Sequence, residues 1–354
     1  MTAGWPVRSI SPEDLDAAVA DGILSREQAL TLARYCAGRA AKTGQADEEN
    51  LRLISSFNDI FVCIGLLLFT GALFYLLTWT LGLGTTAKWV VMAAVAWGLA
   101  EYFTRIKRLA LPSIVLMILF AVSALYATAG LFDSRSPLEI LFSHGSGMPL
   151  LVPSLVTIAA VVVHWFWFHV PITVAAGAAA AVLTVSALFS SGGAGPVFDS
   201  RMLVILFVLG LAVFAIAMMF DMQDRARVTR RTDIAFWLHL LAAPLIVHPV
   251  VGPLASSGEM TQGGAIAVFA VFIAFSVVAL VVDRRALLVS SLGYLIYAST
   301  TLLRVTDWET SAIAVAILLV GAMVLMLSAA WRVLRRLLLQ ALPSFITTRV
   351  PVAA

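Results

Sequence analysis

The stretch FNDIFVCIGLLLFTGALFYLLTW, residues 57–79, decides the fold class of this chain. It holds one charged residue, Asp59, in twenty-three positions. A membrane-spanning helix needs about 20 predominantly apolar residues, and this run reaches that length without interruption. Further runs of the same kind follow, and together they predict ten spanning helices, at 57–79, 86–103, 109–131, 149–168, 170–190, 202–220, 234–251, 263–282, 286–303 and 310–331.

The composition excludes most other classes of protein. Hydrophobic residues make up 61% of the 354 positions and charged residues 12%, whereas soluble domains carry about 25% charged residues. So little charge rules out an ordinary soluble enzyme and a disordered chain. Barrel strands would be short and alternating, but these runs are long and continuously apolar. The sequence therefore predicts an all-α polytopic transmembrane helix bundle.

Lysine and arginine positions predict how this bundle is oriented. If the N-terminus is cytoplasmic, 19 of the 23 basic residues fall on the cytoplasmic side and 4 fall outside, as is usual for membrane proteins. We therefore expect both termini in the cytoplasm, with a cytoplasmic region at 1–56, the bundle at 57–331 and a tail at 332–354. The basic residues are spread over short loops, so no nucleic-acid partner is expected.

The region before the first span predicts a small helical hairpin. Residues 11–14 (SPED) supply an N-cap, a proline at the first helical position and acids, and residues 25–28 (SREQ) form a capping box. Gly22 suits the end of the first helix, and 47–56 predicts an amphipathic lead-in helix. Two interpretations stay open: a cap that packs on its own helices or on the membrane surface, and a docking or regulatory module.

Three short segments resemble a known family. Residues 10–15 (ISPEDL), 21–25 (DGILS) and 57–62 (FNDIFV) are similar to the start of a family of uncharacterised bacterial inner-membrane proteins that begin with a short helical hairpin. The likeness covers about the first 70 residues. It implies a bacterial inner membrane, and it assigns no activity and no catalytic residue.

Turns on the basic side recur along the chain. They are expected near residues 106, 169, 226 and 285, about 60 residues apart. One interpretation is a duplicated helical hairpin, which transporters often use. The other is that two spans with two short loops always take about this length.

Ionisable groups at the ends of the spans are the first functional candidates, because charge is costly in a bilayer. Three acids end helices, where the helix dipole disfavours them, and each has an arginine nearby in sequence. We expect the local ion pairs Glu101–Arg105, Asp221–Arg225 and Asp283–Arg284. The alternative is a polar vestibule on the basic side that binds a cation or a polar substrate.

His239 is the best single candidate, because it lies well inside a predicted span. Asp233 precedes it, and Pro244 follows and is expected to open the backbone. We predict a polar pathway formed by Asn58, Asp59, Asp233 and His239, with His164, His169 and Glu101 as lesser candidates. The histidines lack any H-E-x-x-H spacing, so we assign no metal, no cofactor and no catalytic residue.

Ten spans with both termini inside are typical of transporters, so we expect a transporter or a flippase-like carrier, and a neutral small molecule or lipid as its cargo. Charge is nearly absent from the middle of the spans, where ion-coupled transporters usually bind ions. The alternative is a scaffold or regulatory protein that recruits a partner through the N-terminal hairpin, and an intramembrane enzyme is less favoured. The expected partners are the lipid bilayer and either a second copy or another membrane protein.

Overall fold

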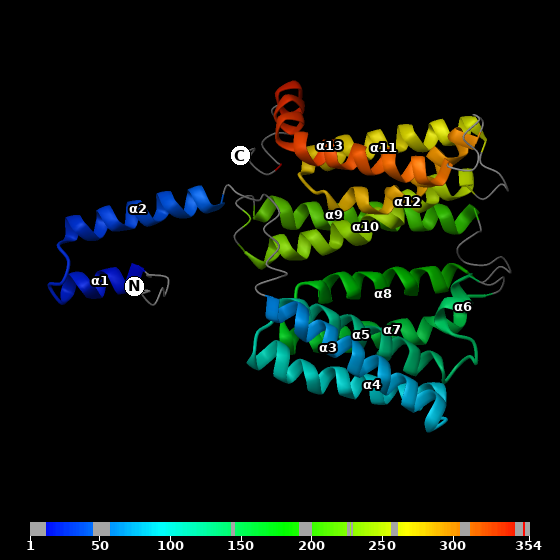
Figure 1. Ribbon diagram of the computed structural model, residues 1–354. Helices are drawn as coiled ribbons and strands as arrows, with labels where there is room; N and C mark the ends of the chain where they lie inside the picture. Colours follow the sequence, from blue (N-terminus) through cyan, green and yellow to red (C-terminus); the bar gives the residue numbers. More distant parts are fainter. Residues whose placement is uncertain are drawn as a thin grey trace. The chain divides into compact units, whose positions relative to one another are not determined.

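Every regular element in the described part of the chain is a helix, so the all-α prediction is confirmed (Figure 1). The structure is a computed structural model, and it describes residues 12–44, 57–142, 146–190, 200–224, 227, 229–255, 261–304, 312–343 and 350. The chain divides into two compact units, Met1–Asn50 and Leu51–Ala353. We describe each unit by itself.

The first unit contains α1 (Pro12–Ala20) and α2 (Arg26–Gly44). The predicted capping box of α2 is confirmed: the Gln28 N–H donates to Ser25 Oγ at 3.2 Å, and the Ser25 N–H donates to Gln28 Oε1 at 2.9 Å. Gly22, in the turn, has φ +69°, a conformation that glycine adopts without steric cost. The cap expected at Ser11 and the lead-in helix expected at 47–56 lie outside the described residues.

The second unit is the membrane bundle. Within the described residues, nine helices are long and apolar enough to cross a membrane. In chain order they are α3 (Phe57–Tyr75, continued by the π-helical turn Leu76–Thr80), α5 (Ala110–Ala129), α7 (Leu151–Phe168, preceded by the 3₁₀ turn Met148–Leu150), α8 (Ile172–Phe189), α9 (Ser200–Gln223), α10 (Arg230–Ala255), α11 (Gln262–Val282), α12 (Ala286–Arg304) and α13 (Ala312–Ala341).

The remaining predicted span, 86–103, is also helical. It forms α4 (Thr85–Ala100), which continues as a π-helical segment over Glu101–Ile106. It is not among the nine, and it carries Lys88 and Glu101 within its helical length. Nevertheless α4 packs along α5, as the other spans pack along their neighbours.

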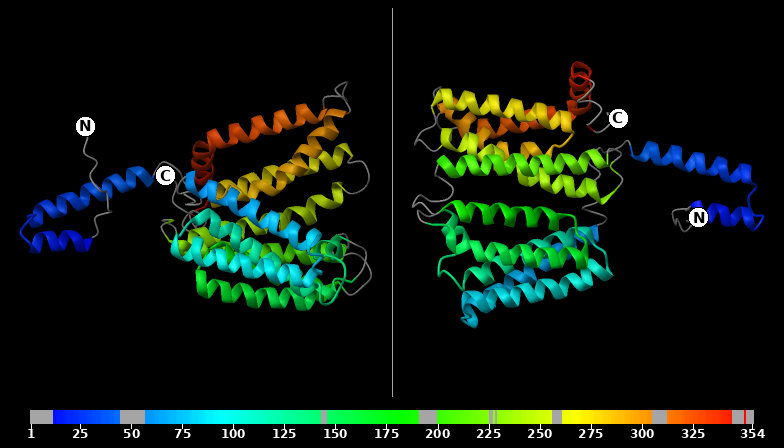
Figure 2. Two further views of the ribbon diagram at one scale, coloured as in Figure 1. Left: turned by 60° about the horizontal axis from the view of Figure 1, so that its bottom comes forward. Right: turned by 180° about the vertical axis from the view of Figure 1, so that it is seen from behind.

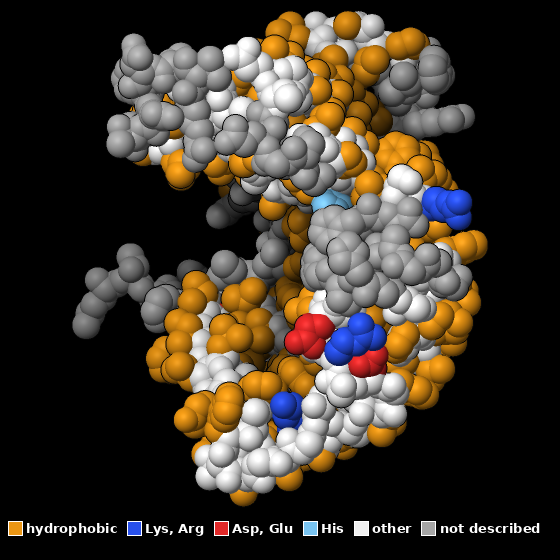
Figure 3. All heavy atoms as spheres, turned by 90° about the vertical axis from the view of Figure 1, so that its right-hand side faces the viewer, with side chains coloured by type: hydrophobic (Ala, Val, Ile, Leu, Met, Phe, Trp, Pro, Cys, Tyr) orange, Lys and Arg blue, Asp and Glu red, His pale blue; other side chains and the backbone are white. Residues whose placement is uncertain are grey.

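Four hairpins make up most of the bundle: α4/α5, α7/α8, α9/α10 and α11/α12. α4/α5, α7/α8 and α11/α12 are joined by tight turns, and the four pairs are all connected at the same end of the unit (Figures 1 and 2). Neighbouring hairpins meet through α5 on α7, α8 on α10, and α10 on α12, while α3 packs on α5 and α13 on α12. Seen from the other end, the helices form a curved row that is hollowed on one side (Figure 3).

The centre of the row is α10, which packs against α8, α9, α11 and α12. Its buried side includes small residues among larger ones, and Ala235, Ala242 and Ala243 are completely buried. On α9, a Cβ at Gly210 would lie 2.8 Å from the Ile246 side chain and 2.9 Å from the Leu245 backbone carbonyl carbon. Glycine is therefore needed for α9 and α10 to approach this closely.

The last helix differs from the expected boundary. α13 continues to Ala341, whereas the span was expected to end at 331. Two residues near its C-terminal end, Trp331 and Arg335, are buried. The first part of the predicted tail is thus packed against the bundle.

A short connecting helix, α6 (Pro137–Phe142), lies at the end opposite the four hairpin connections. Its first turn is capped reciprocally by Ser136 and Glu139. In the loop before it, Arg135 bonds Asp133 at 2.7 Å and, mainly through these hydrogen bonds, lowers the pKa of Asp133 to about 2.

Candidate functional site

Polar groups of the bundle gather at the end formed by the turns at 106–110, 168–172, 223–230 and 282–286, which we call the basic end. Each turn contains a non-glycine residue in the left-handed conformation: Arg108, His169, Arg227 and Asp283, with φ between 55° and 59°. After α11 the Arg284 N–H donates to the Ala279 carbonyl at 2.9 Å, the long bond of a Schellman motif. In the fully described turns after α4, α7 and α11, the left-handed residue reverses the chain and returns the next helix along the previous one.

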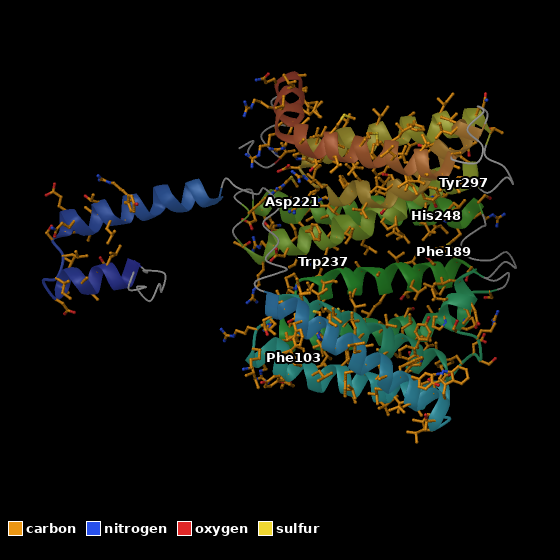
Figure 4. All side chains as sticks on the ribbon, viewed as in Figure 1. Phe103, Phe189, Asp221, Trp237, His248 and Tyr297 are labelled. Carbon is orange, nitrogen blue, oxygen red and sulfur yellow. The ribbon has the colours of Figure 1, made fainter. Side chains whose placement is uncertain are left out.

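Asp221, near the end of α9, is the centre of the first buried cluster (Figure 4). Arg284, two residues before α12, donates to the Asp221 carboxylate from two nitrogens: Nε lies 3.2 Å from Oδ2, and Nη2 bonds Oδ1. His239 of α10 contacts Asp221 Oδ2 through Nε2 at 2.8 Å. All three side chains are at most 1% exposed. A bidentate guanidinium–carboxylate pair of this kind joins α9 to α12 with a defined geometry.

Asp283, which caps the end of α11, is the centre of the second cluster. Arg227 donates to its Oδ2 at 2.8 Å and also to its backbone carbonyl at 3.0 Å. Trp331 Nε1 of α13 donates to Oδ1 at 2.8 Å. Arg335, one turn further along α13, lies 3.7 Å from the same carboxylate and donates to the Leu280 carbonyl at 3.2 Å. These contacts hold the C-terminal part of α13 against the turn between α11 and α12.

The buried region around the two clusters holds equal numbers of carboxylates and guanidiniums. A third carboxylate, Asp224, is 6% exposed and accepts hydrogen bonds from the hydroxyls of Thr229 and Thr232. Three carboxylates thus lie together with three guanidiniums in the same part of the bundle: Asp221, Asp224, Asp283, Arg227, Arg284 and Arg335. Burying charge away from water is costly unless it is neutralised and hydrogen-bonded, and this arrangement meets both conditions.

A pocket of about 590 Å³ opens at the basic end. Most of its lining residues come from the α4/α5 and α7/α8 hairpins, which do not contribute to the two buried clusters. Its polar lining includes Arg105, Arg108, Arg230 and Asp233, and its apolar lining includes Ile114, Phe168 and Trp237. The residues come from the turns of α4/α5 and α7/α8 and from the first turns of α10. Figure 4 shows Trp237 on the same side of the bundle as Asp221. A volume of this order suits a small ligand or the polar part of a larger amphiphile.

The two strongest sequence candidates on α10 lie on different faces of that helix. Asp233 lines the pocket together with Arg230 and Trp237, which recur at helical spacing. His239 turns instead to Asp221, and its Nδ1 atom is buried without a hydrogen-bond partner in the described structure. The expected opening at Pro244 is not seen, since α10 runs unbroken through that residue.

The other predicted residues are dispersed. His169 is exposed at its turn and lines the pocket. His164 is completely buried among Trp97, Phe120 and Phe168, and its Nδ1 is 3.4 Å from the Thr173 hydroxyl. Asn58 is exposed and Asp59 is buried at the start of α3, and neither lines the pocket.

The predicted local ion pairs have mixed outcomes. Glu101–Arg105 is confirmed at 3.2 Å, and Glu101 also accepts a bond from Trp167 Nε1. Asp283–Arg284 is wrong: the left-handed turn points the two neighbouring side chains to different partners, so that Arg284 binds Asp221 and Asp283 binds Arg227. Arg225 lies outside the described residues, and Asp221 is held by Arg284 and His239.

Arg335, Arg227 and Trp331 are the residues that sequence reasoning missed. Their partners lie 48 to 56 positions away along the chain, so no local pattern connects them. One signal was present: Asp221 and Asp283 end apolar helices, where an acid is unfavourable unless a cation neutralises it. That signal indicates that a partner exists without indicating which one.

Within the described residues, no group of three or more His, Cys, Asp or Glu side chains is placed to hold a metal ion. Comparison of the chain with models of protein families, with curated proteins and with solved structures finds no match. The arrangement at the basic end therefore carries the functional argument alone.

Proposed function

We propose that this integral membrane protein is a carrier of the transporter or flippase type for a lipid-like amphiphile or a neutral small molecule. The observation that carries the proposal is the pocket at the basic end. Its lining combines charged residues with the apolar side chains Ile114, Phe168 and Trp237. A site with one polar and one apolar part fits a cargo that also has both.

The distribution of charge in the spans supports the same class of cargo. In the described membrane helices the charged side chains lie near helix ends, with Asp59, Lys88 and Arg201 close to helix starts and the buried clusters at the basic end. A charged cargo would need compensating groups near the middle of the bilayer. A cargo whose interior portion is uncharged needs none.

For location, we propose a bacterial inner membrane with the basic end in the cytoplasm. The turns at the basic end carry Lys107, Arg108, Arg230 and Arg231, whereas the opposite end carries few basic residues. The excess of basic residues on one side is the pattern that sets orientation during insertion. The resemblance of the first 70 residues to bacterial inner-membrane proteins supports the same assignment.

The test is lipid movement in vesicles that contain the purified protein. Fluorescent lipids in the inner leaflet become accessible to an external quencher only when they cross the bilayer. We expect exchange above that of protein-free vesicles, and we expect Ala110→Trp, which fills the pocket, to slow it several-fold. Val163→Trp, at a 56% exposed position of α7 outside the pocket lining, should leave the rate unchanged.

Background rates for lipids, sugars and amino acids with the native protein would overturn the carrier function. Equal rates for Ala110→Trp and Val163→Trp would overturn the role of the pocket. Thermal unfolding of both variants shows whether either substitution has disturbed the fold.

A scaffold function is the second candidate, and one observation favours it. Within the first unit, Ile23, Leu30 and Tyr35 are 73%, 53% and 63% exposed. Exposed apolar side chains on a two-helix unit are suited to covering by a partner. A photo-cross-linker at Arg34 should then capture one dominant protein in intact cells, and no adduct would count against a partner at this surface.

A further inference from the structure

We propose that the pocket at the basic end binds a phosphate-bearing anionic group, held by Arg108 and Arg230 and covered on its apolar side by Phe168 and Trp237. The proposal rests on the pocket of the proposed function and names the ligand class that the pocket accepts. A phospholipid headgroup could bind there from the basic end, where the arginines lie, without entering the uncharged middle of the spans.

The first support is the charge of the lining. Three arginines, Arg105, Arg108 and Arg230, face one carboxylate, Asp233. Arg105 is partly neutralised by Glu101 at 3.2 Å and stacks over Trp167 with 5.0 Å to the ring centroid. Arg108 and Arg230 form no ion pair with any residue that the structure describes. Positive charge therefore exceeds negative charge in the pocket, and two guanidiniums remain available to a ligand.

The second support is the direction of three helices. The lining includes the residues where α5, α8 and α10 begin: Leu109 and Ala110, Val170 and Pro171, and Arg230. The N-terminus of a helix carries a partial positive charge and N–H groups without intrahelical partners, and it favours anions. These helices have 20, 18 and 26 residues, so each has several turns of aligned peptide dipoles behind its N-terminus. Three helix N-termini at one pocket add their partial positive charge to the charge of the arginines.

The third support is the backbone at Arg108. This arginine has φ +55° at the turn between α4 and α5. The left-handed conformation is unfavourable for a non-glycine residue, and glycine would avoid that cost. The same conformation occurs at the other connections of the basic end, and at this one it places a guanidinium in the pocket lining.

Guanidinium chemistry and the size of the pocket both suit a phosphate ester. A guanidinium presents parallel N–H donors that match two phosphate oxygens. A volume of about 590 Å³ has room for a phosphate ester together with a glycerol-sized substituent against Trp237. The headgroup of a glycerophospholipid and a soluble phosphate ester share this chemistry.

The experiment is a binding titration of the full-length protein by native mass spectrometry from detergent. The probes are phosphatidylglycerol, diacylglycerol without phosphate, and glycerol 3-phosphate as a soluble competitor. We expect phosphatidylglycerol to bind and diacylglycerol not to bind. The pair Arg108→Gln with Arg230→Gln should weaken phosphatidylglycerol binding about 100-fold, since each lost charge-assisted contact is worth about tenfold.

A matched control removes the same charge from neighbouring positions. Lys107 and Arg231 are each one residue away from the pocket arginines, are exposed, and are not part of the lining. The pair Lys107→Gln with Arg231→Gln should leave the affinity within about twofold. Equal losses in the two pairs would overturn the site and indicate attraction by net charge alone, as would equal binding of phosphatidylglycerol and diacylglycerol.

The competitor identifies the source of the phosphate. Displacement of phosphatidylglycerol by millimolar glycerol 3-phosphate supports a site that takes soluble esters, and no displacement supports a lipid headgroup site. The test also separates the two proposals. Selective binding with background movement of lipids, sugars and amino acids would refute the carrier function and keep the site, whereas lipid movement without phosphate-selective binding would refute the site and keep the carrier.

Discussion

Arg284 shows how strongly one residue can depend on a partner that is remote in sequence. It lies next to Asp283 but bonds Asp221, 63 positions earlier, and it also donates to the Thr232 carbonyl at 3.2 Å. Both members of the Arg284–Asp221 pair are 1% exposed. Removing either one leaves a charge that is buried and uncompensated, which is more costly than losing the pair altogether.

We predict that Arg284→Ala destabilises the bundle by about 3–5 kcal/mol, because Asp221 then keeps a buried charge with only His239 as a partner. Thermal unfolding in detergent, followed by tryptophan fluorescence, measures the change. Arg231→Ala removes an exposed arginine of α10 and should change stability by less than about 0.5 kcal/mol.

The double variant Asp221→Asn with Arg284→Ala tests the coupling. It should cost less than the sum of the two single substitutions, by about 0.5–3 kcal/mol, because the residues act as one unit. An Arg284→Ala variant as stable as Arg231→Ala would show that the pair adds nothing to the fold.

At the scale of the elements, the four connections at the basic end each contain a left-handed non-glycine residue, but the side chains of these residues have different roles. His169 is exposed, whereas Asp283 is buried and accepts bonds from Arg227 and Trp331. The left-handed conformation is equally unfavourable in both, but only at Asp283 do the side-chain bonds offset it. A left-handed residue is a common way to end a helix, so its recurrence after α4, α7, α9 and α11 leaves both interpretations of the spacing open.

Glycine substitution should therefore have opposite effects at the two turns. His169→Gly should stabilise the protein by about 0.5–1 kcal/mol, because relief of the left-handed strain exceeds the added chain entropy. Asp283→Gly should destabilise it by about 3 kcal/mol or more, because Arg227 loses a buried carboxylate partner. Melting temperatures of the two variants, measured side by side, give the signs, and a lower melting temperature for His169→Gly would contradict the argument.

At the scale of the whole molecule, the bundle is polar at one end and apolar along its length. Large apolar side chains such as Leu318, Leu325 and Met326 of α13 are 70%, 72% and 65% exposed. In water such a surface would aggregate, and in a bilayer it faces lipid tails. The basic end holds the arginines that are buried in ion pairs, those that line the pocket, and exposed ones such as Arg231.

The orientation gives a direct prediction. With Cys36 and Cys63 replaced by alanine, Ser134→Cys at the opposite end should react with a membrane-impermeant maleimide in intact bacterial cells. Lys107→Cys at the basic end should react only after the membrane is opened, because the positive-inside pattern places it in the cytoplasm. Both positions are exposed, so accessibility within the protein does not differ. Labelling in the reverse order would invert the orientation.

Much of the bundle could be predicted from sequence, because each span is specified by its own apolar run. The expected limits 263–282 and 286–303 agree within about a residue with α11 (Gln262–Val282) and α12 (Ala286–Arg304). The last helix was the exception. Residues after 331 include Arg332, Arg335 and Arg336, which resemble a polar tail, but α13 continues because Trp331 and Arg335 find buried partners on the α11/α12 turn.

The site was only partly predictable. His239 and Asp233 were recognised because an ionisable group in an apolar run stands out locally. Their partners were not, since Asp221, Arg284 and the pocket arginines come from separate hairpins whose packing no local pattern specifies. The sequence alone determined the class of the protein, the positions of its helices and the side that carries the charge, because the bilayer acts on each segment independently. Which charges neutralise one another, and which arginines remain around a pocket, was decided only by the tertiary structure, because buried ion pairs depend on the approach of helices that are distant in the chain.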